Sequence, residues 1–381
     1  FDEIIERRGT NSYKWDLVKE DGVIPMWVAD MDFRCPECVH NAIKKYMECG
    51  AYGYDMLSTR FYKAFIQWEK ECHGYEVEPE WIRYSTGVVQ AFYWCIVCMT
   101  KEKDSVLVLP PVYYPFFDAV NQTGRTLVES DLVWNGEEYR MDYADIEKKI
   151  SENNVKMLLF CSPHNPIGRV WKREELEKLS EICQKHNVII VSDEIHHDFV
   201  YENFKHIPMT LIQKENTVIL TSASKTFNLA GLTTAVAVIP DDKLRKNWDS
   251  LATKIHIFEG NSFGYLAGEA AYLEGKEWID QVKEIIYRNY IFLRDQLLKR
   301  LPKLEIAPLE GTYLMWVNFG AYLDSSEISG FFEKECKIAL DYGEWFHGNS
   351  ETWVRFNLAT SDEIIEKAAQ VILEQADKRN W

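Results

Sequence analysis

The most informative stretch of the chain reads Thr217-Val218-Ile219-Leu220-Thr221-Ser222-Ala223-Ser224-Lys225-Thr226-Phe227-Asn228. Its apolar start predicts a buried strand, and Lys225 follows the end of that strand. The hydroxyls of Ser222 and Ser224 flank this lysine, which suits a site that holds a phosphate ester and presents an amine to an aldehyde. Ser-x-x-Lys alone is weak evidence, because a lysine can simply cap a strand.

Two more polar residues stand at the ends of predicted strands. Asp193 follows the apolar run 187–192, and Asn165 follows the run 157–160 in the motif Ser162-Pro163-His164-Asn165-Pro166-Ile167-Gly168. Taken singly, Asp193 could be a helix cap and Asn165 ordinary turn chemistry. Taken together with the lysine, they predict pyridoxal 5′-phosphate (PLP). This cofactor needs a Schiff-base amine (Lys225), a carboxylate that keeps the ring nitrogen protonated (Asp193) and an amide donor for its phenolic oxygen (Asn165).

These motifs resemble the fold-type I PLP enzymes of the aminotransferase class I and II superfamily, whose pattern is Asn-Pro-x-Gly, then Asp, then Ser-x-x-Lys. The closer resemblance is to the cystathionine β-lyase and C–S lyase branch, the MalY, PatB and cystalysin type. It covers essentially the whole chain, and the segments that carry it are Trp27-Val28-Ala29-Asp30-Met31-Asp32-Phe33, Tyr52-Gly53-Tyr54, Pro111-Val112-Tyr113-Tyr114, Ser192-Asp193-Glu194-Ile195-His196 and Ser222-Ala223-Ser224-Lys225-Thr226-Phe227-Asn228. Many aminotransferases carry an arginine eight residues after the lysine to hold the phosphate, and this chain has Thr233 there.

The resemblance implies roles for further residues. Tyr113 stacks on the cofactor ring and belongs with Lys225 and Asp193 to the catalytic set. The phosphate is held by Ser222, Ser224, the backbone amides of Gly87 and Val88 at a helix start, and Tyr54 reaching across a homodimer. The substrate contacts Tyr114 and Arg355, whose planar fork matches an α-carboxylate. From the residues alone, an internal salt bridge is the favoured reading of Arg355, and Gly87 could be a simple helix start.

Strand-like and helix-like stretches alternate along the chain, and this alternation indicates an α/β fold with a largely parallel sheet. Strand-like runs lie at 105–109, 157–160, 188–191, 218–220 and 234–239, with helix-like stretches such as 172–186 between them. A nicotinamide-binding unit would show the same alternation, but its glycine-rich motif Gly-x-Gly-x-x-Gly does not follow any of the strand-like runs. At 381 residues we expect two domains. By resemblance, these are a large cofactor-binding domain over 46–285 and a smaller α/β domain made of 1–45 and 286–381.

The composition and charge of the chain argue against two classes of binding partner. The formal charge of −17 argues against nucleic acid and anionic membranes, and no apolar run is long enough to span a bilayer. Nine cysteines include two Cys-x-x-Cys pairs, at 35/38 and 95/98, which we read as small apolar residues rather than a metal or redox site. His196 and His197 are adjacent, so we expect them to point apart, with His196 near the cofactor and no metal bound. No remnant of a leader is visible, and cytoplasm is the expected compartment.

The predicted activity is PLP-dependent α,β-elimination. L-Cystathionine or L-cysteine would give pyruvate, ammonia and a thiol, with Lys225 as the base that removes the α-proton. The alternative is an aminotransferase of aromatic or other apolar L-amino acids, which would use the same residues. A third reading, a regulatory or interaction protein on the same fold, predicts a damaged site, whereas all the expected residues are present.

Overall fold

A seven-stranded sheet lies at the centre of the computed structural model, which describes residues 1, 5–54, 59–201, 203–257 and 260–381. β10 runs antiparallel to both of its neighbours, and the other neighbouring pairs are parallel. The order of strands is β2 (Ile82–Ser85), β10 (Ala235–Val238), β9 (Thr217–Thr221), β8 (Ile189–Asp193), β7 (Val155–Cys161), β3 (Ser105–Val108) and β4 (Thr126–Glu129). The predicted α/β fold with a mostly parallel sheet is confirmed.

All five runs predicted as strands form strands of this sheet, namely β3, β7, β8, β9 and β10. Four of them are parallel strands that are buried on both faces, so their central residues form a continuous apolar run. Such a run is the strand pattern that is easiest to recognise in a sequence. β2 and β4 at the two edges were not predicted. Each is four residues long and interrupted by polar side chains, so it offers no apolar run.

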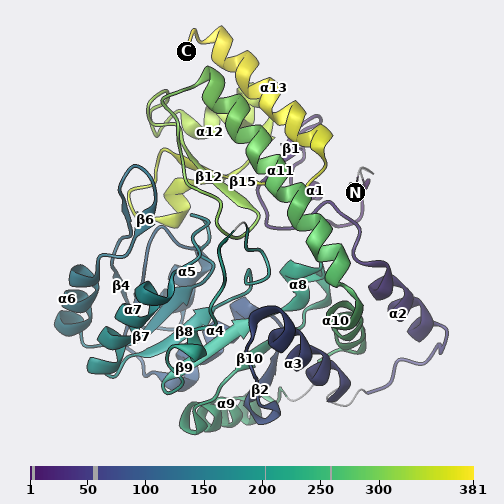
Figure 1. Ribbon diagram of the computed structural model, residues 1–381, viewed down its shortest axis with the longest axis vertical. Helices are drawn as coiled ribbons and strands as arrows, with labels where there is room; N and C mark the ends of the chain where they lie inside the picture. The colour runs from purple at the N-terminus through teal and green to yellow at the C-terminus, as the bar shows by residue number, and fades with distance from the viewer. Residues whose placement is uncertain (2–4, 55–58, 202, 258–259) are drawn as a thin grey trace.

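Alternating side chains of the sheet build two separate cores. Leu158 and Phe160 of β7 pack with the helices on one face, and Met157 and Leu159 pack with those on the other. Figure 1 shows these helices around the sheet. The first face is covered by α6 (Tyr143–Asn153) and α7 (Arg173–Lys185), and the second by α4 (Val88–Met99), α5 (Pro115–Gln122) and α9 (Asp242–Ile255).

The C-terminal third of the chain forms a second, antiparallel sheet. Its strands are β11 (Glu305–Ile306), β12 (Leu314–Asn318), β15 (Trp353–Asn357) and β14 (Asp341–Tyr342), in that order. The long helices α11 (Lys276–Arg300) and α13 (Asp362–Lys378) lie side by side beyond it (Figure 1). β1 (Ile24–Pro25) pairs with β13 (Ile338–Ala339), which joins the N-terminal segment to this part of the fold. The domain limits near 45 and 285 stay predictions.

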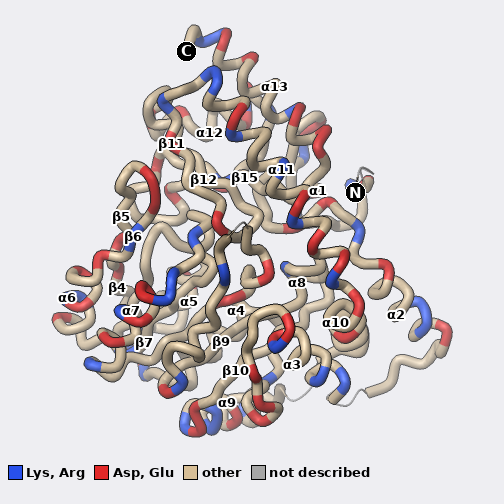
Figure 2. Tube along the Cα trace, in the orientation of Figure 1, with Lys and Arg blue, Asp and Glu red and all other residues tan. Residues whose placement is uncertain are grey.

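The remaining helices surround α10 (Ser262–Glu274), which packs against both α2 (Glu37–Met47) and α3 (Thr59–His73). The shorter elements are α1 (Tyr13–Asp16), α8 (Ala223–Thr226), α12 (Ile328–Gly330), β5 (Val133–Trp134) and β6 (Tyr139–Arg140). Figure 2 shows acidic and basic residues interspersed along outer helices such as α9, α11 and α13. Within the described ranges, no helix is both long and apolar enough to cross a membrane.

Candidate active site

A cavity of about 400 Å³ opens at the carboxyl ends of the parallel strands, where ligands of such sheets bind. The structure brings ten of the eleven predicted site residues into its wall: Gly87, Val88, Tyr113, Tyr114, Asn165, Asp193, Ser222, Ser224, Lys225 and Arg355. The eleventh, Tyr54, lies outside this wall, and its side chain is fully exposed. The roles given to these residues stay predictions.

Lys225 reaches the cavity from the short helix α8. Ser222 caps that helix, because its Oγ accepts from the amide of Ser224 at 2.9 Å and donates to the carbonyl of Thr234 at 2.7 Å. The Lys225 amine donates to the carbonyl oxygen of Ala29 at 2.6 Å. Burial lowers the pKa of Lys225 to about 8, although the nearby Asp30 carboxylate opposes that shift. The amine is therefore deprotonated far more easily than an exposed lysine.

Asp193 closes β8, and its side chain is almost completely buried. Its Oδ1 accepts from the backbone amide of Ile195 at 3.1 Å. Burial raises the pKa of this carboxyl to about 7, while the Ile195 amide and the charge of Lys225 oppose the shift. A buried carboxylate with so little compensation would be stabilised by any cation, such as a protonated ring nitrogen, that enters the cavity.

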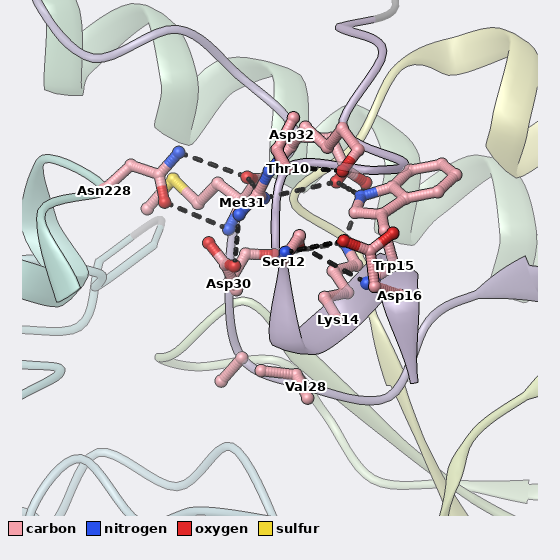
Figure 3. A network of polar contacts seen from close by, with 12 residues as sticks. Thr10, Ser12, Lys14, Trp15, Asp16, Val28, Asp30, Met31, Asp32 and Asn228 are labelled. Atoms are coloured by element: carbon pink, nitrogen blue, oxygen red, sulfur yellow. Dashed lines mark hydrogen bonds and ion pairs between the residues drawn. The ribbon is translucent and has the colours of Figure 1, made fainter. Parts of the chain in front are cut away.

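Val28 and Ala29 of the N-terminal segment 27–33 line the cavity next to Lys225, and a polar network holds the segment in place (Figure 3). Asn228, three residues after the lysine, accepts from the amide of Met31 at 3.3 Å and donates to its carbonyl at 3.1 Å. Lys14 donates to Asp32 at 2.7 Å, and the indole of Trp15 donates to the same carboxylate at 2.9 Å. These contacts fix the Ala29 carbonyl against the Lys225 amine.

Arg355 lies on β15, and its side chain is 2% exposed. It donates to Oδ1 of Asn165 at 2.8 Å and to the carbonyl of Trp27 at 3.0 Å, and it forms an ion pair with the buried Asp341. The internal salt bridge, one of the two roles that the sequence allowed for Arg355, is therefore present. The guanidinium also lines the cavity. Its Nε has no hydrogen-bond partner within the described residues. Because Oδ1 of Asn165 is taken, its amide nitrogen is the group left to donate into the cavity.

An aromatic pair and a helix start complete the wall. Tyr113 and Tyr114 pack with ring centroids 5.2 Å apart, and burial raises the pKa of both phenols, so they stay neutral. Gly87 caps α4, and a Cβ there would lie 2.4 Å from the Gln90 side chain, so a larger residue would crowd this corner. Thr233 also lines the cavity, where the sequence lacks the expected arginine.

His196 and His197 line different cavities, and they lie in a turn after β8 rather than on a strand. His196 lines the cavity, and burial lowers its pKa well below the usual value, so it is neutral. His197 belongs to a different buried cluster. Sequence reasoning missed Tyr13 in the cavity wall and Asp341 as the partner of Arg355. Neither lies in a motif, and only the β14–β15 pairing brings Asp341 opposite Arg355.

Comparison with known proteins agrees with this geometry. The family described as aminotransferase class I and II matches residues 22–372. Cystathionine β-lyase PatB of Bacillus subtilis is 36% identical over 95% of both chains. The PLP-bound C–S lyase of Staphylococcus hominis is 33% identical, with a TM-score of 0.93 over 98% of this chain and 96% of that one. A PLP-bound protein of Clostridium difficile 630, provisionally assigned as an aminotransferase, is 38% identical, with a TM-score of 0.95 over 98% of both chains.

These likenesses span nearly the whole chain, and they confirm the fold-type I architecture predicted from the strand-end motifs. The relatives named as lyases match the branch that the sequence motifs indicated. The chain therefore belongs to the aminotransferase class I and II family, in its cystathionine β-lyase and C–S lyase branch.

Proposed function

We propose that the chain is a PLP-dependent C–S β-lyase that cleaves L-amino acids carrying sulfur on Cβ, such as L-cystathionine and L-cysteine. The observation that carries this proposal is the Lys225 amine in one cavity with the buried Asp193 carboxylate and the Arg355 guanidinium. Relatives of the same length that are named cystathionine β-lyase or C–S lyase support it.

The residues present fit PLP. Asp193 offers a buried anion for the ring nitrogen, Tyr113 an aromatic face, and Asn165 a free amide donor. The start of α4 at Gly87 offers backbone amides for the phosphate, beside the hydroxyls of Ser224 and Thr233. Bound PLP would supply an electron sink that makes the α-proton of an amino acid acidic.

Lys225 holds and moves the proton at Cα. Its pKa of about 8 leaves a useful fraction of neutral amine near neutral pH, which a general base requires. The Ala29 carbonyl keeps the amine at the cavity wall through the 2.6 Å hydrogen bond. Because the N-terminal segment around Ala29 is itself tied to Asn228, the base and its orienting group belong to one rigid unit.

Arg355 orients the substrate by its α-carboxylate. The guanidinium is fixed by Asn165 and Asp341, so binding costs little side-chain entropy. The overall reaction is L-cystathionine plus water to pyruvate, ammonia and homocysteine. Lys225 takes the proton from Cα, the Cβ–S bond breaks, and the sulfur leaves as a thiolate that then gains a proton.

The second candidate is an aminotransferase of aromatic or other apolar L-amino acids. It would use the same residues, with Lys225 again moving the proton taken from Cα but with no Cβ–S bond broken. The likeness to the Clostridium difficile protein, provisionally assigned as an aminotransferase, keeps this candidate open.

One experiment separates the two. PLP-loaded protein is incubated with L-cystathionine without any keto acid, and pyruvate and free thiol are followed over many turnovers. Sustained, equimolar release of both is the expected result. Product formation that waits for a keto acid and a different amino acid would instead identify an aminotransferase and reject the lyase.

We further propose a homodimer in which Tyr54 of one chain completes the phosphate site of the other. Tyr54 is fully exposed in the single chain and so is available to a partner. A heterodimer of one Lys225→Ala chain and one Tyr54→Ala chain tests this. It would contain one intact site, and regain about half of the wild-type activity, only if the two residues come from different chains.

The cytoplasm is the compartment we propose. All nine cysteines are free, which suits a reducing environment. Cell fractionation with an antibody against the protein tests this assignment.

A further inference from the structure

A second buried polar cluster lies behind the cofactor cavity and plays no part in the proposed chemistry. Glu69 and His73 come from α3, and His197 and Asp198 from the turn after β8. All four side chains are less than a tenth exposed. The rings of His73 and His197 pack edge to face, with centroids 4.4 Å apart. Such a concentration of ionisable groups in a core requires charge compensation.

The tautomer of His197 is set by its surroundings. Its Nδ1 lies 2.6 Å from the carbonyl oxygen of Glu194, which can only accept, so Nδ1 carries a hydrogen. The other nitrogen, Nε2, lies 3.4 Å from Oε1 of Glu69 and 3.3 Å from Oδ2 of Asp198. A lone pair facing two carboxylate oxygens would be repelled. A positive species, either a proton or a metal ion, must therefore sit at this point.

The geometry suits a metal ion. Ligand atoms about 2.0–2.1 Å from a tetrahedral Zn²⁺ lie about 3.4 Å apart, which is the observed spacing of Glu69 Oε1 and His197 Nε2. One ligand atom each from Glu69, His73 and His197 falls within 4.8 Å of the other two. Glu69 Oε1 and His197 Nε2 are fully buried and form no hydrogen bond within the described part of the chain. A proton on Nε2 would reach these oxygens only across 3.3 and 3.4 Å, which is longer than the roughly 2.7–2.9 Å of a charge-assisted hydrogen bond.

We propose that Glu69, His73 and His197 bind one divalent transition-metal ion, most suitably Zn²⁺. Two imidazoles and one carboxylate are a donor set that zinc accepts, with a fourth position open. Nε2 of His73 lies 2.9 Å from Oδ1 of Asp198, a contact that binding of the ion through Nδ1 keeps and binding through Nε2 replaces. The Glu194 carbonyl that holds Nδ1–H of His197 is the kind of outer partner that orients metal-binding histidines. Glu69 and Asp198 together supply the two negative charges that would balance the ion.

An approach to the site exists. A cavity of about 330 Å³, partly open to solvent, is lined by His73, His197 and Asp198, and also by Cys72 and Lys283. The ion would tie α3 to the turn after β8. Asp198 extends this tie to the catalytic helix, because it accepts from Thr226 at 2.6 Å, and Thr226 is the neighbour of Lys225. The proposed role is structural and does not depend on the lyase assignment.

The test uses the PLP-loaded protein. Metal is stripped with a chelator, the protein is equilibrated with buffered Zn²⁺, and bound zinc per chain is measured by mass spectrometry. His197→Ala and Glu69→Gln remove ligands, and His186→Ala, a histidine paired with Glu147 on the surface, is the matched control. The PLP absorbance and the circular-dichroism spectrum establish that each variant is folded.

We expect one zinc per chain in the wild type and in the control, with affinity at least about tenfold weaker in the two ligand variants. Zinc should raise the melting temperature of the wild type and have no such effect on His197→Ala. Anomalous scattering from zinc-soaked wild-type crystals should place the ion between Glu69 and His197, whatever the variants do. The proposal is overturned if the wild type binds no zinc, if the ion lies elsewhere, for example at Cys35 and Cys38, or if folded His197→Ala binds it equally well.

Discussion

The six residues from Asp193 to Asp198 divide between two buried polar clusters that differ in how well their charges are compensated. On the cavity side, burial raises the pKa of Asp193 to about 7 and lowers that of Lys225 to about 8, so both charges are poorly supported. On the far side, Asp198 accepts hydrogen bonds from Trp68, His73 and Thr226, and its pKa lies well below the usual value.

This difference in charge compensation indicates a ligand-binding role for the cavity side and a structural role for the far side. A cavity meant for a charged ligand keeps its own charges under-compensated until the ligand arrives, as perturbed groups at functional sites generally do. In the cluster behind it, Asp198 is satisfied by hydrogen bonds that link α3, the turn after β8 and α8, whereas Glu69 Oε1 and His197 Nε2 are left for the proposed ion. Substitutions on the cavity side should therefore mainly change activity, and those on the far side should mainly change stability.

The largest expected effect is that of Lys225→Ala. Losing the base should lower kcat for pyruvate release from L-cystathionine by about ten-thousandfold, the upper range for a general acid–base group. The melting temperature of the cofactor-free protein should not fall, because the variant removes a partly buried amine whose charged form is destabilised by its surroundings. The matched control is Lys283→Ala, a partly buried lysine beside the far cluster, which should leave kcat close to that of the wild type because it lies outside the wall of the Lys225 cavity. A large loss in that control would erase the distinction between the two sides.

The next effect concerns pH. The folded pKa of Asp193, about 7, lies above its ordinary value of 3.8, so the folded protein binds more protons between these values and stability falls as pH rises through that window. Ionisation of Asp193 lowers the free energy of unfolding by an amount on the order of 4 kcal/mol, because each pKa unit corresponds to about 1.36 kcal/mol. Cofactor-free Asp193→Asn should therefore match the wild type near pH 4 and exceed it in urea-unfolding stability at pH 8.

Asp193→Asn should nevertheless lose activity with PLP, because the ring nitrogen loses its anionic partner. Equal stability of the two proteins at both pH values would show that the carboxylate is better compensated than its surroundings indicate.

Asp198→Asn should do the opposite. It removes the carboxylate beside His73 and one of the two carboxylates beside His197, whose other one is Glu69. This should cost about 3 kcal/mol of stability in urea unfolding, near the lower bound for breaking a buried ion pair, because the amide keeps part of the hydrogen bonding. The kcat of the folded, PLP-loaded fraction should change far less than in Lys225→Ala, because Asp198 lies outside the cavity wall. A drop comparable to that of Lys225→Ala, with unchanged stability, would mean that the far cluster takes part in the chemistry.

The sequence predicted the cavity side far better than the far side. Lys225, Asp193 and Asn165 follow apolar runs at the ends of parallel strands, and such ends meet at one edge of a sheet. Their convergence could therefore be inferred from strand order alone. Glu69 and His73 lie on an amphipathic helix far from His197 in sequence, and only the packing of α3 brings them together. Asp341 was missed for the same reason, since its place opposite Arg355 depends on the register of β14 and β15.

The smallest expected effect is that of Arg355→Lys. This substitution tests whether Arg355 binds the substrate or serves only as the counter-ion of Asp341. A lysine can keep the ion pair with Asp341 but cannot present a planar fork to a carboxylate. If Arg355 binds the substrate, KM for L-cystathionine should rise about tenfold, a loss of about 1.4 kcal/mol, while the melting temperature changes little. If Arg355 serves only as the counter-ion of Asp341, the lysine should preserve KM. Inhibition by simple carboxylates provides a second readout, because it should weaken in parallel with substrate binding and not with stability.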